Sequence, residues 1–376
     1  MATSGRISAK HAKPTEVTMK KLALALATTA AAIVGFAAAA EAAPTKVCFV
    51  YVGSHTDGGY SQAHDLGRQQ VQKEFGDKIE TPYLENVPEG PDAERAIERL
   101  ARSGCSLIFS TSFGFMDATV KVAAKFPKVK FEHATGFKSG PNLATYNSRF
   151  YEGRYILGQI AAKTSKNHGA AYIASFPIPE VVMGINSFEQ GARSVDPSFK
   201  LKVVWVNTWF DPGKEADAAK AMVDQGVDIL TQHTDTTAPM QVAQERGIHA
   251  FGQASDMIAA GPKAQLTAII DTWGNYYSKR VHALLDGKWK SEQSWDGLKD
   301  GILKMGPYTN MPDDVKKMAQ ETEAKIKSGE LAPFTGPINK QDGTPWLKAG
   351  EKADDGTLLG MNFYVEGVDD KLPASK

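Results

Sequence analysis

Short runs of β-branched and aromatic residues alternate with amphipathic helical patterns along most of this chain. Such a βαβα order with apolar strands is typical of parallel sheets covered by helices on both faces. Because about nine strand-like runs exceed one doubly wound sheet of ordinary size, we expect an α/β protein with two Rossmann-like lobes. The runs are residues 47–52, 79–84, 107–110, 129–133, 170–175, 202–206, 229–232, 250–251 and 266–270.

The boundaries between the lobes are placed where this alternation is interrupted. A Gly-Pro loop at 140–141 is followed by a short strand and a new helix, and small residues cluster at 253–261. We therefore predict a first lobe of residues 43–146 plus about 255–300, and a second lobe of 147–254 plus about 301–376. The chain would cross the hinge several times, and its tail, with one helix over 312–328, would wrap over a lobe.

The segment before residue 43 has the pattern of a secretory signal peptide. Lys20 and Lys21 precede an apolar stretch over 22–40, and Ala40-Glu41-Ala42 forms a small-x-small cleavage site. We expect residues 1–42 to be removed, with 1–18 an over-called start, although the apolar stretch is nearly long enough for a membrane anchor. No cysteine stands at the cleavage point, which argues against a lipoprotein. Two α/β lobes behind such a signal are typical of a periplasmic binding protein.

Charge and cysteine usage narrow the class further. Residues 1–42 hold five basic and two acidic residues, so the equal totals of 43 become a net charge of about −3 in the mature chain. This balance argues against nucleic acid as a partner, because such partners require clustered Lys and Arg. Cys48 and Cys105 each lie in or beside an apolar run. Export permits a disulfide, but two cysteines without metal-type spacing are more often separate core residues.

Aromatic residues gather in the loops that follow the predicted strands, where α/β sheets bind their ligands. Flat faces contributed by both lobes suit a planar ring held by stacking. The loops lack the Arg clamp expected for a carboxylate ligand and the Asp/Asn/Arg ring expected for a sugar. The aromatic candidates are Tyr60, Phe113, Phe115, Phe176, Trp209 and Phe210.

Polar residues of the same loops have both structural and ligand-binding interpretations. Asp235, between two threonines after a strand, is the best candidate to accept N–H groups of a ligand. Asp57 either closes a turn with Gly58-Gly59 or contacts the ligand edge together with Ser61. The other polar members are Asp117, Asp211, Asp256, His233 and Thr234, of which Asp117 and Asp211 stand at helix starts. Neither HExxH nor G-x-S-x-G spacing occurs, so we expect no metal, no cofactor and no catalytic residue.

Several motifs in order resemble the basic membrane protein (BMP) family of ABC-transporter substrate-binding proteins, which includes purine nucleoside receptors. "DGGYSQAHDLG" (57–67) is similar to the family's D-x-S-F-N-Q signature. "YEGRYILGQIAAKTSKNHGAAYIA" (151–174) and "GINSFEQGARSVDP" (184–197) follow, and "FGQASDM" (251–257) comes last. The resemblance covers most of residues 46–285. It implies the two-lobe periplasmic fold, a purine-type ligand and a permease partner in the inner membrane.

The resemblance also assigns roles to single positions. Tyr60 takes the place of the family's base-stacking Phe, and Ser61 that of its Asn. Tyr51 or a neighbour stands where the family's first strand ends in an Asp. Ala254 replaces the first Asp of the family's G-V-D-x-D, of which Asp256 remains, and Asp271, beside Trp273, stands where a Lys is usual. The departures fall on groups expected to hold ribose.

The resemblance with these departures predicts a monomeric, non-enzymatic binding protein for a free purine base such as adenine rather than a nucleoside. The stacking aromatics persist, whereas the ribose-binding groups do not. A sugar or an autoinducer in the same fold remains an alternative. A secreted nucleoside hydrolase is a further one.

Overall fold

The computed structural model describes residues 1–3, 5 and 43–373, and the chain from Pro44 onward forms one compact unit. The signal peptide expected over residues 1–42 lies almost wholly outside these residues. Within them, no helix has the length and apolar character needed to cross a membrane.

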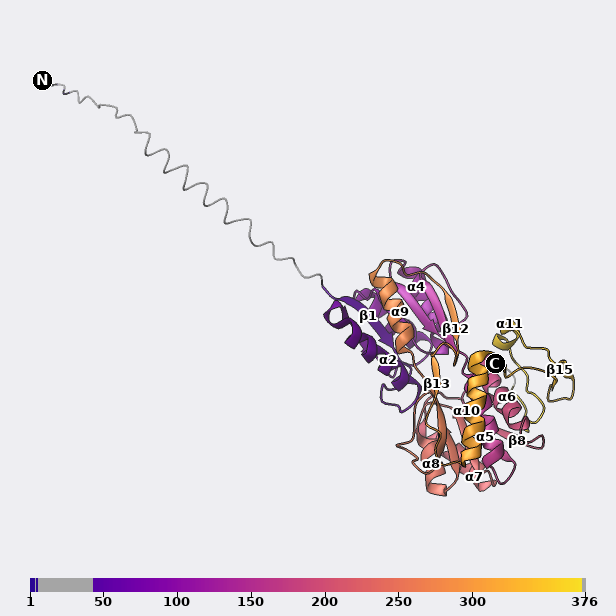
Figure 1. Ribbon diagram of the computed structural model, residues 1–376. Helices are drawn as coiled ribbons and strands as arrows, with labels where there is room; N and C mark the ends of the chain where they lie inside the picture. The colour runs from indigo at the N-terminus through magenta and orange to yellow at the C-terminus, as the bar shows by residue number, and fades with distance from the viewer. Residues whose placement is uncertain (4, 6–42, 374–376) are drawn as a thin grey trace, which may run out of the picture. The chain divides into compact units, whose positions relative to one another are not determined.

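The first lobe is built on a parallel sheet with strand order β12-β6-β5-β4-β1-β2, in which β3 also pairs with β1. Side chains that alternate along β1 face opposite layers: Val47 and Phe49 belong to the core under α2 and α9, whereas Val50 packs with α3 and α4 (Figure 1). Its strands are β1 (Thr45–Val50), β2 (Ile79–Glu80), β3 (Tyr83–Leu84), β4 (Leu107–Ser110), β5 (Lys130–Ala134), β6 (Leu143–Ser148) and β12 (Gln293–Asp296). Its helices are α2 (Tyr60–Phe75), α3 (Pro91–Arg102), α4 (Met116–Lys125) and α9 (Gly274–Leu285), with 3-10 turns at Gly76–Lys78 and Phe113–Phe115.

The second lobe repeats this architecture with the order β13-β11-β10-β9-β7-β8, in which only β13 runs antiparallel to its neighbour. Its strands are β7 (Gly169–Ala174), β8 (Lys200–Trp205), β9 (Ile229–His233), β10 (His249–Gly252), β11 (Gln265–Asp271) and β13 (Leu303–Met305). Its helices are α5 (Tyr151–Thr164), α6 (Pro179–Arg193), α7 (Pro212–Asp224) and α8 (Ala238–Arg246). The predicted two-lobe α/β fold is confirmed.

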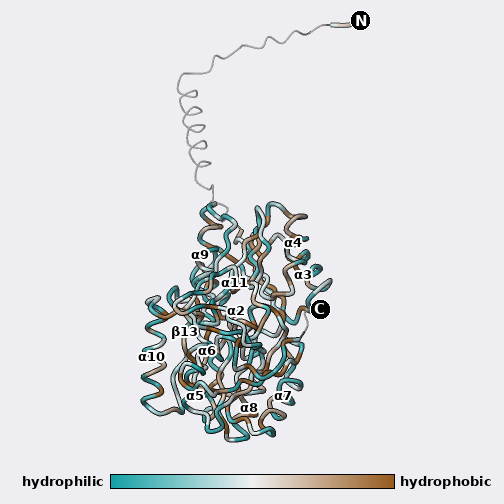
Figure 2. Tube along the Cα trace, turned by 90° about the vertical axis from the view of Figure 1, so that its right-hand side faces the viewer, coloured by the Kyte–Doolittle hydropathy of each residue, from teal (hydrophilic) through white to brown (hydrophobic). Residues whose placement is uncertain are grey.

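The tail belongs to the second lobe, as Figure 2 shows for its long helix α10 (Asp313–Ser328). Val315, Ala319 and Ile326 are buried on one face of α10, and the remainder of that helix is largely hydrophilic. Beyond it lie a small hairpin, β14 (Ile338–Asn339) with β15 (Pro345–Leu347), and the short helix α11 (Asp355–Leu359). The expected tail helix over 312–328 therefore corresponds to α10.

The chain changes lobes after β6, after β11 and after β12. The second of these crossings differs from the predicted boundary near residue 255. Ala250 and Gly252 of β10 pair with β11, and β11 pairs with β13, so residues 265–271 belong to the second sheet. The cluster of small residues at 253–261 forms a loop within the second lobe instead of a hinge.

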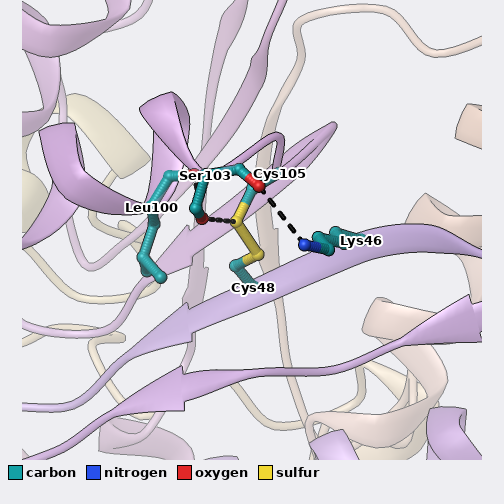
Figure 3. The surroundings of a disulfide bond; sticks show 5 residues. All are labelled: Lys46, Cys48, Leu100, Ser103 and Cys105. Atoms are coloured by element: carbon teal, nitrogen blue, oxygen red, sulfur yellow. Dashed lines mark hydrogen bonds between the residues drawn. A yellow bond between two sulfur atoms is a disulfide. The ribbon is translucent and has the colours of Figure 1, made fainter.

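Cys48 and Cys105 form a disulfide, contrary to the expectation of separate core residues (Figure 3). Cys48 lies in β1, and Cys105 lies at the approach to β4, which is the parallel neighbour of β1. Their Cα atoms are 6.0 Å apart, which is a usual separation for a bridge. The two runs were recognised as strands, but spacing along the sequence does not reveal which strands are neighbours.

Candidate functional site

One small cavity lies between the two lobes, where the carboxyl ends of their strands meet. In each sheet the chain order reverses next to the first strand of the lobe, β1 or β7, and ligands of open α/β sheets bind at such reversals. In this closed arrangement the cavity has a volume of about 30 Å³, room for one or two water molecules, so a ring ligand requires the lobes to move further apart. Its walls are Val52, Tyr60, Ser112, Phe113 and Thr135 from the first lobe, and Glu180, Trp209, His233, Asp235 and Gln253 from the second.

The loop after β1 is shaped so that Tyr60 begins helix α2 at the cavity wall. Asp57 accepts hydrogen bonds from the backbone N–H groups of Gly59 (2.8 Å), Ser61 (2.8 Å) and Gln62 (3.0 Å). A Cβ on Gly59 would lie 2.3 Å from the backbone oxygen of Asp235, so only glycine permits this approach of the lobes. Asp57 therefore caps the loop and does not line the cavity.

Ser61 also supports this loop from behind. Its side chain is fully buried, and its Oγ accepts a hydrogen bond from the backbone N–H of Gly53 at 3.2 Å. The prediction that Ser61 contacts the ligand edge is not supported by this geometry.

Tyr60 is held by a stack of aromatic rings that extends towards the hinge. Its ring meets His64 edge-on at 4.4 Å, and His64 stacks on Trp273 at 4.7 Å with an interplanar angle of 11°. Trp273 is 1% exposed and does not reach the cavity. Trp273, predicted as a ligand contact, is instead the support of Tyr60.

Trp209 forms the opposite wall and also joins the lobes. Its indole Nε1–H donates to Glu89 Oε1 at 3.0 Å, and Glu89 accepts further hydrogen bonds from Ser112 Oγ (2.6 Å) and Gly114 N (3.1 Å). Glu89 thus links the second lobe to the first in a closed arrangement. The sequence did not single out Glu89, because the loop between β3 and α3 in which it lies contains no aromatic residue that would mark it as part of the site.

The two remaining aromatic candidates from the second lobe lie outside the cavity. Phe176 packs against Trp209 with ring centroids 5.1 Å apart, and Phe210 is 36% exposed. Phe113 and Trp209 thus line the cavity together with Tyr60, whereas Phe176 packs behind Trp209.

Asp235 is the most unusual polar group of the cavity. Its residue is 3% exposed, and its Oδ2 has no hydrogen-bond partner among the described residues. Burial, followed by the nearby carboxyl groups of Asp57 and Glu215, raises the pKa of Asp235 well above its usual range. A buried acceptor without a partner is costly unless a ligand satisfies it.

Glu180, in the first turn of α6, supplies a second carboxyl group. Its side chain is 17% exposed, and burial raises its pKa to about 7. His233 Nε2 lies 3.9 Å from Glu180 Oε1, but burial lowers the pKa of His233 well below its usual value, so the imidazole is neutral. The segment "ASFPIPE" was recognised as a strand-end loop, yet nothing in its pattern distinguishes Glu180 from an ordinary helix-start carboxylate.

Gln253 is oriented by a buried cation that the sequence did not reveal. Arg154 of α5 is fully buried, and its guanidinium donates to Thr231 Oγ1 (2.9 Å) and the Gln232 carbonyl (2.6 Å). It also donates to Gln253 Oε1, which leaves the Gln253 amide N–H groups for other partners. Arg154 itself does not line the cavity.

Two carboxylates singled out from the sequence lie elsewhere. Asp256 is exposed and accepts from Ile258 N (3.1 Å) and Gln265 Nε2 (2.7 Å), so it stabilises a turn. Asp271, at the end of β11, is buried and accepts from Ser148 Oγ at 3.3 Å across the hinge. The prediction of Asp256 as a ligand contact is therefore not supported by this geometry.

The cavity combines aromatic faces with hydrogen-bonding groups and lacks a positive charge. Within the described part of the chain, its walls contain no Lys or Arg, and no three His, Cys, Asp or Glu side chains are grouped to hold a metal ion. Such a site suits a flat, uncharged ligand that stacks on rings and donates N–H groups to carboxyl oxygens. Anionic ligands would meet two carboxyl groups and no compensating cation.

Comparison with known proteins agrees with this architecture. The family model described as ABC transporter substrate-binding protein PnrA-like (Bmp) matches residues 44–334. A purine-binding protein of Brucella abortus (strain 2308) is 65% identical over 350 residues, which cover 93% of this chain and 100% of that protein. A putative ABC transporter glucose-binding protein of Haloferax volcanii is 34% identical, over 89% of this chain and 83% of that one.

Solved structures share the fold at low sequence identity. A solute-binding protein of an ABC transporter system from Aeropyrum pernix K1 superimposes with a TM-score of 0.67 at 18% identity, over 84% of this chain and 95% of that chain. One from Conexibacter woesei gives 0.61 at 18% identity, over 77% and 98%. The family match and the 65% identical relative carry the assignment: this chain belongs to the Bmp family of PnrA-like ABC transporter substrate-binding proteins.

Proposed function

We propose that this protein is the periplasmic solute-binding component of an ABC importer and that its ligand is a free purine base such as adenine. The observation that carries the proposal is the buried Oδ2 of Asp235, which has no partner among the described residues and lies in a cavity walled by Tyr60, Phe113 and Trp209. An amino-substituted purine ring offers flat faces that can stack on these aromatic side chains and N–H donors that can bond to Asp235. The name of the Brucella abortus relative supports the same ligand class.

A free base is favoured over a nucleoside because a ribose would add polar hydroxyl groups that need partners. In addition, the family has an Asp at the position of Ala254 and usually a Lys at the position of Asp271. Asp271 accepts a hydrogen bond from Ser148 and does not line the cavity.

Isothermal titration calorimetry with adenine, guanine, xanthine, adenosine and glucose tests the proposal. We expect at least one base to bind with a Kd of about 1 μM or less, and adenosine and glucose to bind at least tenfold more weakly. Tight adenosine binding without base binding would contradict the preference. Glucose binding without purine binding would favour the alternative suggested by the name of the Haloferax volcanii relative.

The affinity for the base should rise with pH through neutrality because of Glu180. Its pKa of about 7 means that Glu180 is partly protonated in the free protein at neutral pH, and the ionised carboxylate accepts a ligand N–H more strongly than the protonated acid does. Below pH 7 the affinity should therefore fall by up to about tenfold per pH unit. Titrations from pH 5.5 to 8.5 on the wild type and on Glu180→Gln check this, with the slope lost in the variant.

The raised pKa of Glu180 should make the ligand-free protein less stable as pH rises, whereas it makes ligand binding stronger. The folded protein binds this proton more tightly than the unfolded chain does, so this contribution is complete below pH 4.5 and is lost as pH rises through about 7. Ligand-free Glu180→Gln should consequently be more stable than the wild type at pH 8, as measured by thermal unfolding. An unchanged pH slope of binding together with unchanged stability would remove Glu180 from the site.

Delivery would depend on the two lobes closing over the base, as the Glu89–Trp209 bond between them illustrates. The closed protein would then act as a monomer that docks on a permease in the inner membrane. Export would use the proposed signal segment over residues 1–42. No covalent step and no cofactor enters this proposal.

A further inference from the structure

A second hollow adjoins the ring cavity on the side of the hinge. This groove holds about 340 Å³ and shares three residues with the cavity, namely Phe113, Thr135 and Glu180. Its first wall consists of residues after β5, in β6 and in β12, and its second consists of the start of α6 and the tail helix α11. Beyond the shared residues, its apolar lining includes Phe137, Met183, Trp295 and Leu359, and its polar lining includes Asn147 and Gln293.

The rim of the groove exposes large apolar side chains to solvent. Phe137 is 61% exposed and Leu359 is 48% exposed, and both rank among the few large apolar residues that the described chain leaves open. Phe137 lies with its ring centroid 6.4 Å from that of Phe113. Through the Phe137–Phe113 contact the apolar rim adjoins the aromatic wall of the ring cavity.

The tail wall of the groove is fixed by specific bonds. Arg149 donates to both carboxylate oxygens of Asp355, at 2.8 and 2.6 Å, and its guanidinium lies 4.2 Å over the ring of Trp295. Asp354 caps α11 through the N–H of Thr357 at 2.7 Å. These contacts join α11 to the first lobe close to β12 (Figure 1). These bonds thus hold the tail wall of the groove in place against the first lobe.

We propose that this groove is a substituent subsite, which accepts an apolar group such as a benzyl attached through nitrogen to a purine ring in the cavity. The proposal rests on the proposed function, because the ring must occupy the cavity first. Trp295, Met183 and Leu359 offer apolar contact to such a group, whereas none of the described Lys and Arg residues lines the groove to favour a phosphate. Purines with apolar substituents would then be ligands as well as the free base.

Calorimetry with adenine, 6-benzylaminopurine and 9-benzyladenine tests this subsite. The two derivatives carry the benzyl group at different edges of the ring, and we expect at least one to bind within about tenfold of adenine. Phe137→Ala and Leu359→Ala should each weaken that derivative by about three- to tenfold through lost apolar contact, with adenine within twofold of wild type. Leu285→Ala, which removes an exposed leucine from α9, is the matched control and should change neither ligand.

The outcomes separate the subsite from the proposed function. Adenine binding combined with affinities more than about tenfold weaker for both derivatives would overturn the subsite and leave the base-binding proposal intact. Equal weakening of adenine and the derivative by the two groove variants would also overturn it. Failure of every purine to bind would overturn the proposed function, and the subsite with it.

Discussion

Replacing Asp235 with alanine is expected to weaken binding of the purine base by about a hundredfold. Asp235 Oδ2 is buried without a partner among the described residues, so a ligand N–H that reaches it gains a bond and relieves a desolvated acceptor. In the alanine variant the ligand N–H is buried without an acceptor, which costs roughly 1–3 kcal/mol, and a hundredfold in affinity is about 2.7 kcal/mol. Calorimetry on wild type and variant measures the difference.

Asp256→Ala is the matched control for this experiment. Asp256 is the same residue type in the same lobe, but it is exposed and bonded within its own turn, so base affinity should stay within twofold of wild type. Asp235→Ala should also remain folded. Burial already disfavours the charged form of this carboxyl group, and its removal leaves no described donor without an acceptor. Equal affinity in Asp235→Ala and wild type would show that Asp235 does not contact the ligand.

Removing the disulfide is expected to lower the free energy of unfolding by about 2–4 kcal/mol. Cys48 and Cys105 are 57 residues apart, and a bridge that closes a loop of this length restricts the unfolded chain strongly. Guanidinium unfolding of Cys48→Ser/Cys105→Ser should show a lower midpoint than wild type. A reductant should shift the wild type towards the variant and leave the variant unchanged.

The same variant should retain most of its affinity for the base at low temperature. The bridge joins the middle of β1 to the approach to β4 (Figure 3), whereas the cavity lies beyond the carboxyl ends of these strands. A reductant that leaves the wild-type midpoint unchanged would contradict a stabilising role for the bridge.

The fold was largely predictable because buried parallel strands are continuous apolar runs. β4 and β9, for instance, correspond closely to the predicted runs at 107–110 and 229–232. The second hinge crossing was misplaced because it depends on which sheet β11 joins. That choice is made by pairing with β10 and β13, which are partners that local sequence does not specify.

The candidate site was predictable only where a residue type suited to ligand binding occurred in a loop that follows a strand. Tyr60, Phe113, Trp209 and Asp235 line the cavity, because each lies in a loop after a strand or begins the next helix, and their contact with a ligand stays a prediction. Trp273 shows the limit of this reasoning, since an aromatic ring packs equally well behind a site as in it.

Glu180, Glu89 and Arg154 were missed for a related reason. Glu180 and Glu89 are surface-type residues by sequence, and only the closing of the lobes brings them to the cavity and its rim. Arg154 lies within a helix, and its role depends on contacts with Thr231 and Gln253, far along the chain. Such pairings are set by tertiary structure.

The central claim, that a free purine base fills this cavity, is tested most directly by identifying the small molecule that the protein retains. The full-length protein would be expressed with its signal segment, purified from the periplasm without added ligand and denatured, and the released compounds analysed by mass spectrometry. We predict a purine base in near-stoichiometric amount in wild type and little of it in Asp235→Ala. Release of a sugar or an intact nucleoside, without any free base, would contradict the claim.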